Sequence, residues 1–136
     1  MKIQNIVSGL CIQALAQAAL IVPSLAFDLI GAWTVDKSAC PQVFTKNGAS
    51  IAFGPNSEMW GKGYIVEGNT IRGQSVKCAI KSKKEAKSGI HLIASCASDI
   101  MIDQVQMSFK ITSDNSITRV FPGIGGLESP YVRCDF

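Results

Sequence analysis

Apolar and polar residues alternate along the second half of the chain. Between residues 104 and 112, Val105, Met107, Phe109 and Ile111 share one face, and polar side chains occupy the other. A period of two is typical of a strand with one buried face. Residues 90–98 follow the same pattern. With the turn signals between them, such patterns predict eight strands: 31–36, 49–53, 63–67, 70–81, 90–98, 104–112, 117–121 and 130–135.

Composition supports an all-β fold. After residue 26 the chain has 12 isoleucines and 7 valines but only 3 leucines. β-Branched side chains are stiff in helices and pack well on pleated sheets. Turn signals such as Asn47-Gly48 and Pro122-Gly123 recur at short intervals. We therefore expect a single domain over residues 27–136, with about eight antiparallel strands in a small up-and-down barrel.

The first residues of the chain have the features of an export signal. Lys2 is followed by an apolar run over residues 6–22, which two glutamines interrupt, so it is a poor stable membrane span. Ser24 and Ala26 stand at −3 and −1 of a cleavage site. The pattern predicts a secretory signal peptide over residues 1–26 and a secreted or periplasmic protein. The alternative is an uncleaved N-terminal anchor.

Four cysteines remain after the predicted leader: Cys40, Cys78, Cys96 and Cys134. An even number in a short exported domain favours disulfides, and the absence of a CxxC pair argues against zinc. Folding residues 70–81 against 90–98 sets Cys78 opposite Cys96. Cys40 would then pair with Cys134, which makes the first and last strands neighbours.

Few residues suggest catalysis. His91 is the only histidine, and its strand position favours a surface role over that of a general base. Asp99 and Asp103 lie in a predicted turn, where aspartate commonly makes local hydrogen bonds, rather than in a set of cation ligands. No catalytic motif appears. We expect a protein that is not an enzyme and that holds no metal or cofactor.

Apolar residues on predicted loops are the candidate binding surface. An up-and-down order places loops 37–48, 67–70, 99–103 and 122–130 at one end of the barrel. The residues expected to bind there are Phe44, Met101, Ile124 and Leu127, with Trp60 as an outlying anchor at the opposite end. Such a cluster is typical of a binding mouth for a partner protein, such as a hydrolase to be inhibited, or for a small apolar ligand. The alternative is a plug that closes the core.

A basic segment provides a different hypothesis. Its lysines are Lys77, Lys81, Lys83, Lys84 and Lys87. The alternation of the strand predicts that Lys77, Lys81 and Lys83 share its outward face, opposite Cys78 and Ile80. The lysines of this segment would suit a structural component of the cell envelope that docks on an anionic polymer. The simpler interpretation is a solvated hairpin whose lysines protect a strand edge. No aromatic residue interleaves the lysines, and the net charge is only +3 for the whole chain, so we expect no nucleic-acid partner.

The motif Gly31-Ala32-Trp33 resembles the start of the calycin barrels, which include lipocalins, avidins and small bacterial metalloprotease inhibitors. The resemblance implies that Trp33 packs at one end of the barrel beneath an arginine from near the C-terminus, here Arg133, in a cation–π contact. The length after the leader is closer to the inhibitors than to lipocalins. The chain also resembles small secreted proteins of Gram-negative bacteria, which implies export but no particular activity.

Overall fold

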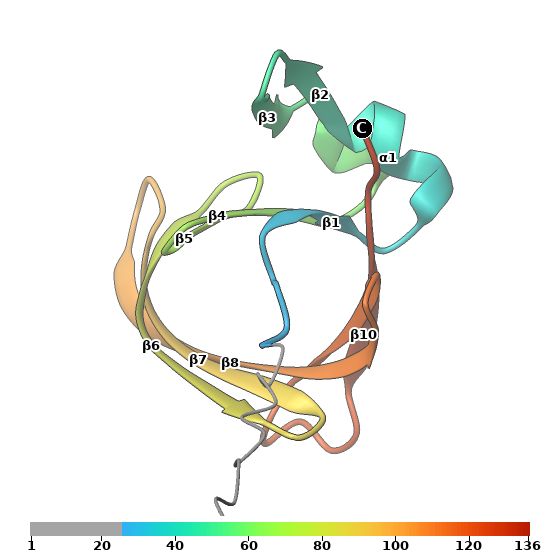
Figure 1. Cartoon of the computed structure of the whole chain (residues 1–136). Coiled ribbons are helices and arrows are strands. Elements are labelled where there is room, and N and C mark those ends of the chain that lie inside the picture. The colour runs from blue at the N-terminus through green and yellow to red at the C-terminus, as the bar shows by residue number, and fades with distance from the viewer. Residues whose placement is uncertain (1–25) are drawn as a thin grey trace, which may run out of the picture.

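Eight antiparallel strands close into a barrel in the computed structural model, which describes residues 26–136 (Figure 1). The predicted signal peptide, except Ala26, lies outside the described residues. The barrel strands are β1 (Gly31–Thr34), β4 (Gly63–Glu67), β5 (Thr70–Arg72), β6 (Lys77–Ala86), β7 (Gly89–Ala97), β8 (Ile102–Ser113), β9 (Ser116–Val120) and β10 (Glu128–Arg133). From β4 onward each strand pairs with the next, and β1 lies between β10 and β4. The predicted all-β barrel is confirmed.

Two of the eight predicted segments do not correspond to single barrel strands. The segment predicted as 70–81 is divided into β5 and β6 by a turn in which the Gly73 amide donates to the Val76 carbonyl at 2.8 Å. The segment predicted as 49–53 is strand β3 (Ser50–Phe53), which pairs outside the barrel with β2 (Phe44–Asn47). The number of barrel strands was therefore predicted correctly, but their membership was not.

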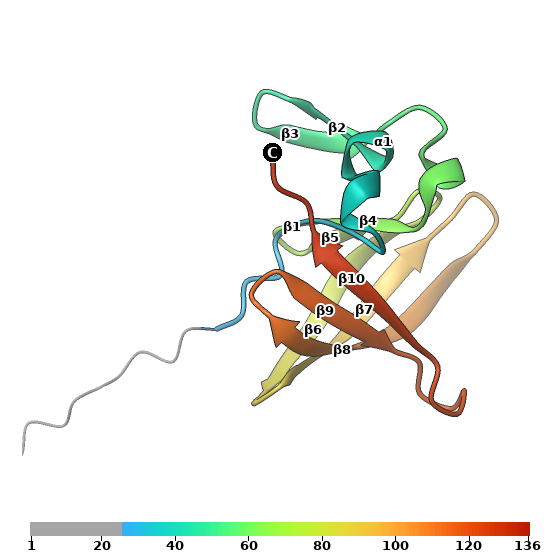
Figure 2. The same cartoon turned by 90° about the vertical axis from the view of Figure 1, so that its right-hand side faces the viewer.

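Residues 35–62 form an insertion on the outer wall of the barrel. It contains the 3-10 helix η1 (Lys37–Ala39), helix α1 (Cys40–Val43), the β2–β3 hairpin and the 3-10 helix η2 (Ser57–Trp60). Figures 1 and 2 show α1, β2 and β3 outside the ring, beside β1 and β4. The outward side chains of Ala32 and Ile65 join the insertion in a second hydrophobic core. The predicted loop 37–48 thus lies against the wall and not at an end of the barrel.

The main core fills the barrel interior. The predicted inward faces of β7 and β8 are confirmed, since Leu92 and Phe109 are buried there. The buried members of this core are Leu29, Trp33, Val66, Ile71, Cys78, Ile90, Leu92, Ala94, Cys96, Met107, Phe109, Ile117 and Tyr131. Because large apolar side chains from all around the ring meet here, burial of this set is the main stabilising contribution to the barrel.

One end of the barrel is organised around Trp33, and we call it the Trp33 end. The Trp33 side chain is fully buried, and its Nε1 donates to the Leu29 carbonyl at 2.9 Å. The Arg133 guanidinium lies over the indole and donates to the carbonyls of Ile30, Asp28 and Asp114. These contacts hold the segment before β1 across this end of the barrel.

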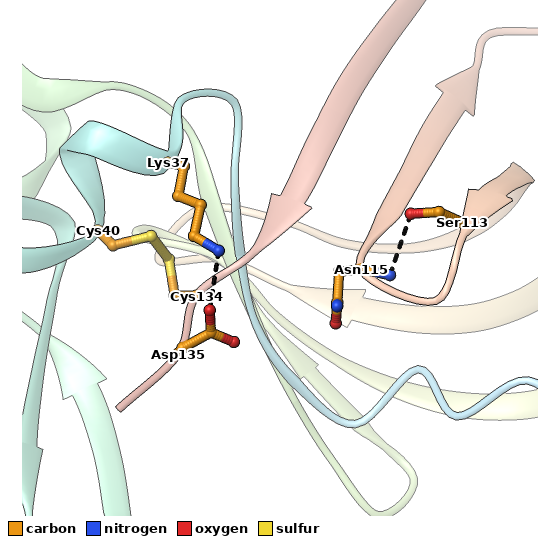
Figure 3. Close-up of polar contacts among 6 residues, drawn as sticks. All are labelled: Lys37, Cys40, Ser113, Asn115, Cys134 and Asp135. Atoms are coloured by element: carbon orange, nitrogen blue, oxygen red, sulfur yellow. Dashed lines mark hydrogen bonds and ion pairs between the residues drawn. A yellow bond between two sulfur atoms is a disulfide. The ribbon is translucent and has the colours of Figure 1, made fainter.

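Both predicted disulfides are present. Cys78 and Cys96 lie directly opposite each other on β6 and β7, with Cα atoms 4.0 Å apart. Cys40 and Cys134 join α1 to the residue after β10, with Cα atoms 5.7 Å apart. Beside this bridge the Lys37 ammonium lies 2.8 Å from the Asp135 carboxylate (Figure 3). The second bridge therefore fastens the insertion to the end of the chain.

Candidate functional site

The end opposite Trp33 carries the longest connections, and we call it the loop end. Because the strands are antiparallel, the turn at 73–76, the β7–β8 connection at 98–101 and the β9–β10 connection at 121–127 all lie there (Figure 2). The predicted grouping of 99–103 with 122–130 agrees with this arrangement. The loop at 67–70 lies instead at the Trp33 end. The segment predicted as one strand, 70–81, is two strands, β5 and β6, so the chain crosses the barrel once more than expected between this loop and the β7–β8 connection.

Helix η2 also belongs to the loop end. The Gln74 side-chain amide donates to the Gly61 carbonyl at 2.7 Å, and Glu58 lines the same pocket as Leu127. The expectation that Trp60 lies at the opposite end from the loops was wrong. The reason is the insertion, which folds back along the outer wall and returns to the chain beside β4.

Exposed apolar residues gather around this end. Seven of the ten large hydrophobic residues that are exposed in the described part of the chain lie on the segments at the loop end. We call this set the apolar rim: Met59, Trp60, Ile100, Met101, Ile102, Ile124 and Leu127. Ile100 is the most exposed, at 92%. Isolated exposed apolar residues are common, but a concentration on one end of a small domain is typical of an interaction surface.

The strand lengths explain why the rim is exposed. β8 pairs with β9 only from Ser108 onward, so its first half pairs with β7 alone and the β7–β8 hairpin extends past β9. Ile100 at its tip consequently has no neighbouring strand to cover it. In the β9–β10 connection, Phe121 and Leu127 are joined by a backbone hydrogen bond of 3.1 Å, which holds Ile124 outward.

Of the residues predicted to bind, four lie on the rim and one does not. Trp60, Met101, Ile124 and Leu127 are exposed. Phe44 is only 2% exposed and packs in the second core, so its aromatic ring is not available to a partner. The sequence predicts a loop at an end of the barrel for the segment that contains Phe44, but this segment belongs to the insertion on the outer wall.

A pocket of about 890 Å³ opens at the loop end. Its wall includes apolar and aromatic side chains together with a few polar groups. The lining residues are Glu58, Lys62, Gly63, Tyr64, Gly73, Gln74, Ser75, Val76, Arg119, Phe121, Leu127, Glu128, Ser129 and Tyr131. This volume and this mixture are typical of a site for a small molecule or for an inserted side chain.

Three polar side chains from three strands meet in this pocket. Arg119 of β9 donates from Nη1 to the Tyr64 hydroxyl on β4, and the Tyr131 hydroxyl on β10 lies 3.5 Å from the same oxygen. The Arg119 guanidinium also lies 4.6 Å from the centroid of the Phe121 ring. Burial, followed by the hydrogen bond with Tyr64, raises the pKa of Tyr131 to about 12, so Tyr131 keeps its proton at neutral pH.

Sequence reasoning missed this polar group. Tyr64, Arg119 and Tyr131 are separated by up to 67 positions and share no motif. One signal was available: Arg119 is two positions from Ile117, so the strand period assigns a charged residue to the inward face of β9. A charge at such a position is a reason to look for a polar site.

A second hollow, of about 920 Å³, lies at the Trp33 end. It is bounded by Ala26 and Phe27, where the chain continues into residues outside the description. Arg133 lines it as well, but its guanidinium already donates to three carbonyl groups. The loop-end pocket is therefore the better candidate for a binding site.

The lysines of the predicted basic patch do not share one face. A bulge between Ile80 and Ser82 shifts the register of β6, so Lys83 pairs with Leu92 on the inward side, where its ammonium lies 2.9 Å from the Glu85 carboxylate. Lys84 pairs with His91 on the outer side. The expectation that Lys83 shares the outward face was wrong, because the alternation is interrupted at the bulge. The end of β6 pairs only with β7, as expected of an edge that lysines protect.

The remaining candidate groups make local contacts. His91 Nδ1 lies 2.9 Å from the Ser108 hydroxyl on the exposed face of β7 and β8. The Asp103 carboxylate accepts a hydrogen bond of 2.7 Å from the Gln104 amide. Within residues 26–136, no group of three or more His, Cys, Asp or Glu side chains is placed to hold a metal ion. In the same residues, no helix is long and apolar enough to cross a membrane.

Comparison with known proteins identified no family. A scan against protein-family models, a search of curated proteins and a search of solved structures each found no match. The functional interpretation of the chain therefore depends on the geometry of the loop end.

Proposed function

We propose that this protein is an exported, non-catalytic binding protein that engages a partner protein through its loop end. The observation that supports the proposal is the apolar rim, which gathers most of the exposed large hydrophobic residues of residues 26–136 on three segments at one end. Burial of such side chains contributes about 25 cal/mol per Å² of apolar surface. Trp60 and Met101 belong to residue types that are enriched at protein interfaces.

A partner protein suits this geometry better than a ligand enclosed within the barrel. The interior is filled by the main core, including Trp33 and Phe109, whereas the apolar residues of the rim project outward. The β7–β8 hairpin extends beyond β9, so it is the segment that would enter a concave surface such as the cleft of a hydrolase. The resemblance to calycin barrels, which include protease inhibitors, implies a contact such as the stacking of Arg133 on Trp33.

The proposed location follows from two features. Two disulfides in a small domain are typical of oxidising compartments, where thiols are not kept reduced. The first 26 residues have the pattern of a secretory leader. The partner is accordingly expected in the periplasm or outside the cell.

Capture by rim variants tests the proposed function. The chain without its leader would be immobilised and exposed to an extract of envelope and secreted proteins, and retained proteins would be quantified by mass spectrometry. We expect a partner held by the wild type to be lost from Ile124→Ser/Leu127→Ser, and then to show at least a tenfold weaker Kd with that variant in a purified complex. Ile30→Ser, which changes a residue of similar exposure near the Trp33 end, should retain it.

Two measurements make this experiment decisive. Near-UV circular dichroism and the Tm should match between the rim variant and the control, because all three side chains are exposed. Equal retention of every protein by wild type and Ile124→Ser/Leu127→Ser would contradict a role for the rim.

A further inference from the structure

We propose that the loop-end pocket binds a carboxylate carried on an apolar group, with Arg119 as the charged contact. The inference deepens the proposed function, on which it rests, by naming the chemical group that enters the binding end. The acid can come from two sources, the C-terminus of a polypeptide or a free organic acid. Both present the same planar pair of oxygens next to apolar atoms.

Within the described part of the chain, no carboxylate forms an ion pair with Arg119. Within residues 26–136 the ion pairs are Lys37–Asp135, Arg72–Glu67, Lys83–Glu85 and Lys110–Glu128. Arg119 is in none of them. It is half-buried, and a guanidinium withdrawn from water favours an anionic partner. Its five N–H donors include one directed at Tyr64, which leaves others for a ligand.

The two tyrosines add a second donor. The Tyr64 hydroxyl oxygen accepts from Arg119 and lies within hydrogen-bond distance of the Tyr131 hydroxyl, which donates to it. A hydroxyl has two acceptor positions and one proton. With both positions used, the Tyr64 proton is left to donate. A carboxylate in the pocket can therefore accept from the Arg119 guanidinium and from the Tyr64 hydroxyl.

The other charged groups of the pocket do not supply a competing partner. Glu128 forms an ion pair with Lys110 on the neighbouring strands. Glu58 and Lys62 are both exposed at the margin of the pocket, and their charges offset each other. Arg119 therefore provides the net charge, and one positive charge matches a monoanion such as a carboxylate better than a dianionic phosphate.

The rest of the lining suits an apolar group attached to the acid. Val76, Phe121 and Leu127 contribute apolar surface, and the Phe121 ring supports the guanidinium plane through a cation–π contact at 4.6 Å. The volume of about 890 Å³ has room for a side chain or a short alkyl chain beside the carboxylate. Leu127 also belongs to the apolar rim, so the pocket is continuous with the proposed partner surface.

The proposal is tested with pairs of probes, each an acid and its neutral analogue. Their binding to the chain without its leader is measured by calorimetry and by the chemical shifts of the protein. The polypeptide probe is N-acetyl-Leu-Phe, compared with its C-terminal amide. The free-acid probe is decanoate, compared with decanol. We expect at least one acid to bind at least tenfold more tightly than its neutral analogue. Arg119→Gln should remove that preference, and Tyr64→Phe should weaken binding of the acid about three- to tenfold.

A matched control removes a charge elsewhere. Lys81→Gln changes an exposed residue of β6 that does not line the pocket, and it should keep the preference for the acid. Whichever acid binds identifies the source of the carboxylate. Binding of neither acid at millimolar concentration would overturn the proposal, and so would equal affinity for acid and neutral analogue in the wild type.

Failure here is distinguishable from failure of the proposed function. If no acid binds but the partner is still lost from Ile124→Ser/Leu127→Ser, the rim acts without the pocket. If the acid binds and the rim variants retain every protein, the pocket is a small-molecule site and the partner proposal is wrong. Near-UV circular dichroism of Arg119→Gln and Tyr64→Phe establishes that each variant is folded.

Discussion

The Arg133 guanidinium lies 4.3 Å from the centroid of the Trp33 ring, on neighbouring strands at one end of the barrel. The same guanidinium donates to three carbonyls, two of them in the segment before β1. Gly31 leaves space for it: the backbone there has a φ of +135°, and a Cβ would lie 3.1 Å from Arg133 Nη1. One arginine thus joins the start, the end and the β8–β9 turn of the barrel.

Replacing this arginine should weaken the Trp33 end. For Arg133→Ala we expect a loss of about 2–3 kcal/mol in the free energy of unfolding, from the cation–π contact and the charged hydrogen bonds. Arg133→Lys should retain only part of this free energy, because an ammonium lacks the planar fork of donors. Urea denaturation followed by tryptophan fluorescence measures both. A change below about 0.5 kcal/mol, the usual range of surface substitutions, would contradict this role for Arg133.

The two disulfides should contribute unequally to stability. On the chain-entropy model the bridge with a separation of 94 residues contributes about 4–5 kcal/mol, and the one with 18 about 3 kcal/mol. We therefore expect Cys40→Ala/Cys134→Ala to be less stable than Cys78→Ala/Cys96→Ala. The first variant should also be cut faster by proteases in the insertion, because α1 loses its link to the C-terminus. Denaturant titration and limited proteolysis check both; the reverse order of stability would contradict the model.

Close packing of the insertion on β4 should make Gly63 sensitive to a methyl group. A Cβ at this position would lie 2.8 Å from Phe44 Cζ and 2.9 Å from Val43 Cγ1. Gly63→Ala should therefore cost about 1–3 kcal/mol through overpacking. Gly125→Ala is the matched control, since a Cβ there meets nothing within 4 Å. Equal Tm values for the two variants would show that the insertion does not pack tightly on the barrel.

Alkaline pH should destabilise the barrel through Tyr131. Burial raises its pKa to about 12 in the folded protein, against about 10 in an unfolded chain. Below pH 10 both states keep the proton; between about pH 10 and 12 only the unfolded chain loses it. Stability should therefore fall across this interval as the pH rises. Tyr131→Phe should show a smaller fall in urea titrations, and an equal slope in both proteins would contradict the assignment.

Much of the fold was predictable because its signals are local. The alternation in residues 90–98 and 104–112 identified the buried faces, and a single hairpin between Cys78 and Cys96 determined both disulfides. The β2 strand was missed because only Phe44 of its residues is buried, so no alternation marks it. The position of Lys83 was assigned wrongly because a bulge changes the register without a sequence signal.

The amino-acid sequence alone therefore determined the fold class, the cysteine pairing and four of the seven apolar residues of the rim, because strand period, turn residues and cysteine number act over short distances. Only the tertiary structure decided where the rim lies and what it surrounds. Tyr64, Arg119 and Tyr131 come from β4, β9 and β10 and meet only when the barrel closes through β1. The outer-wall insertion buries Phe44 and brings Trp60 to the loop end. The insertion packs on β1 and β4, which become neighbours only in the closed ring, so strand patterns along the chain do not reveal this contact.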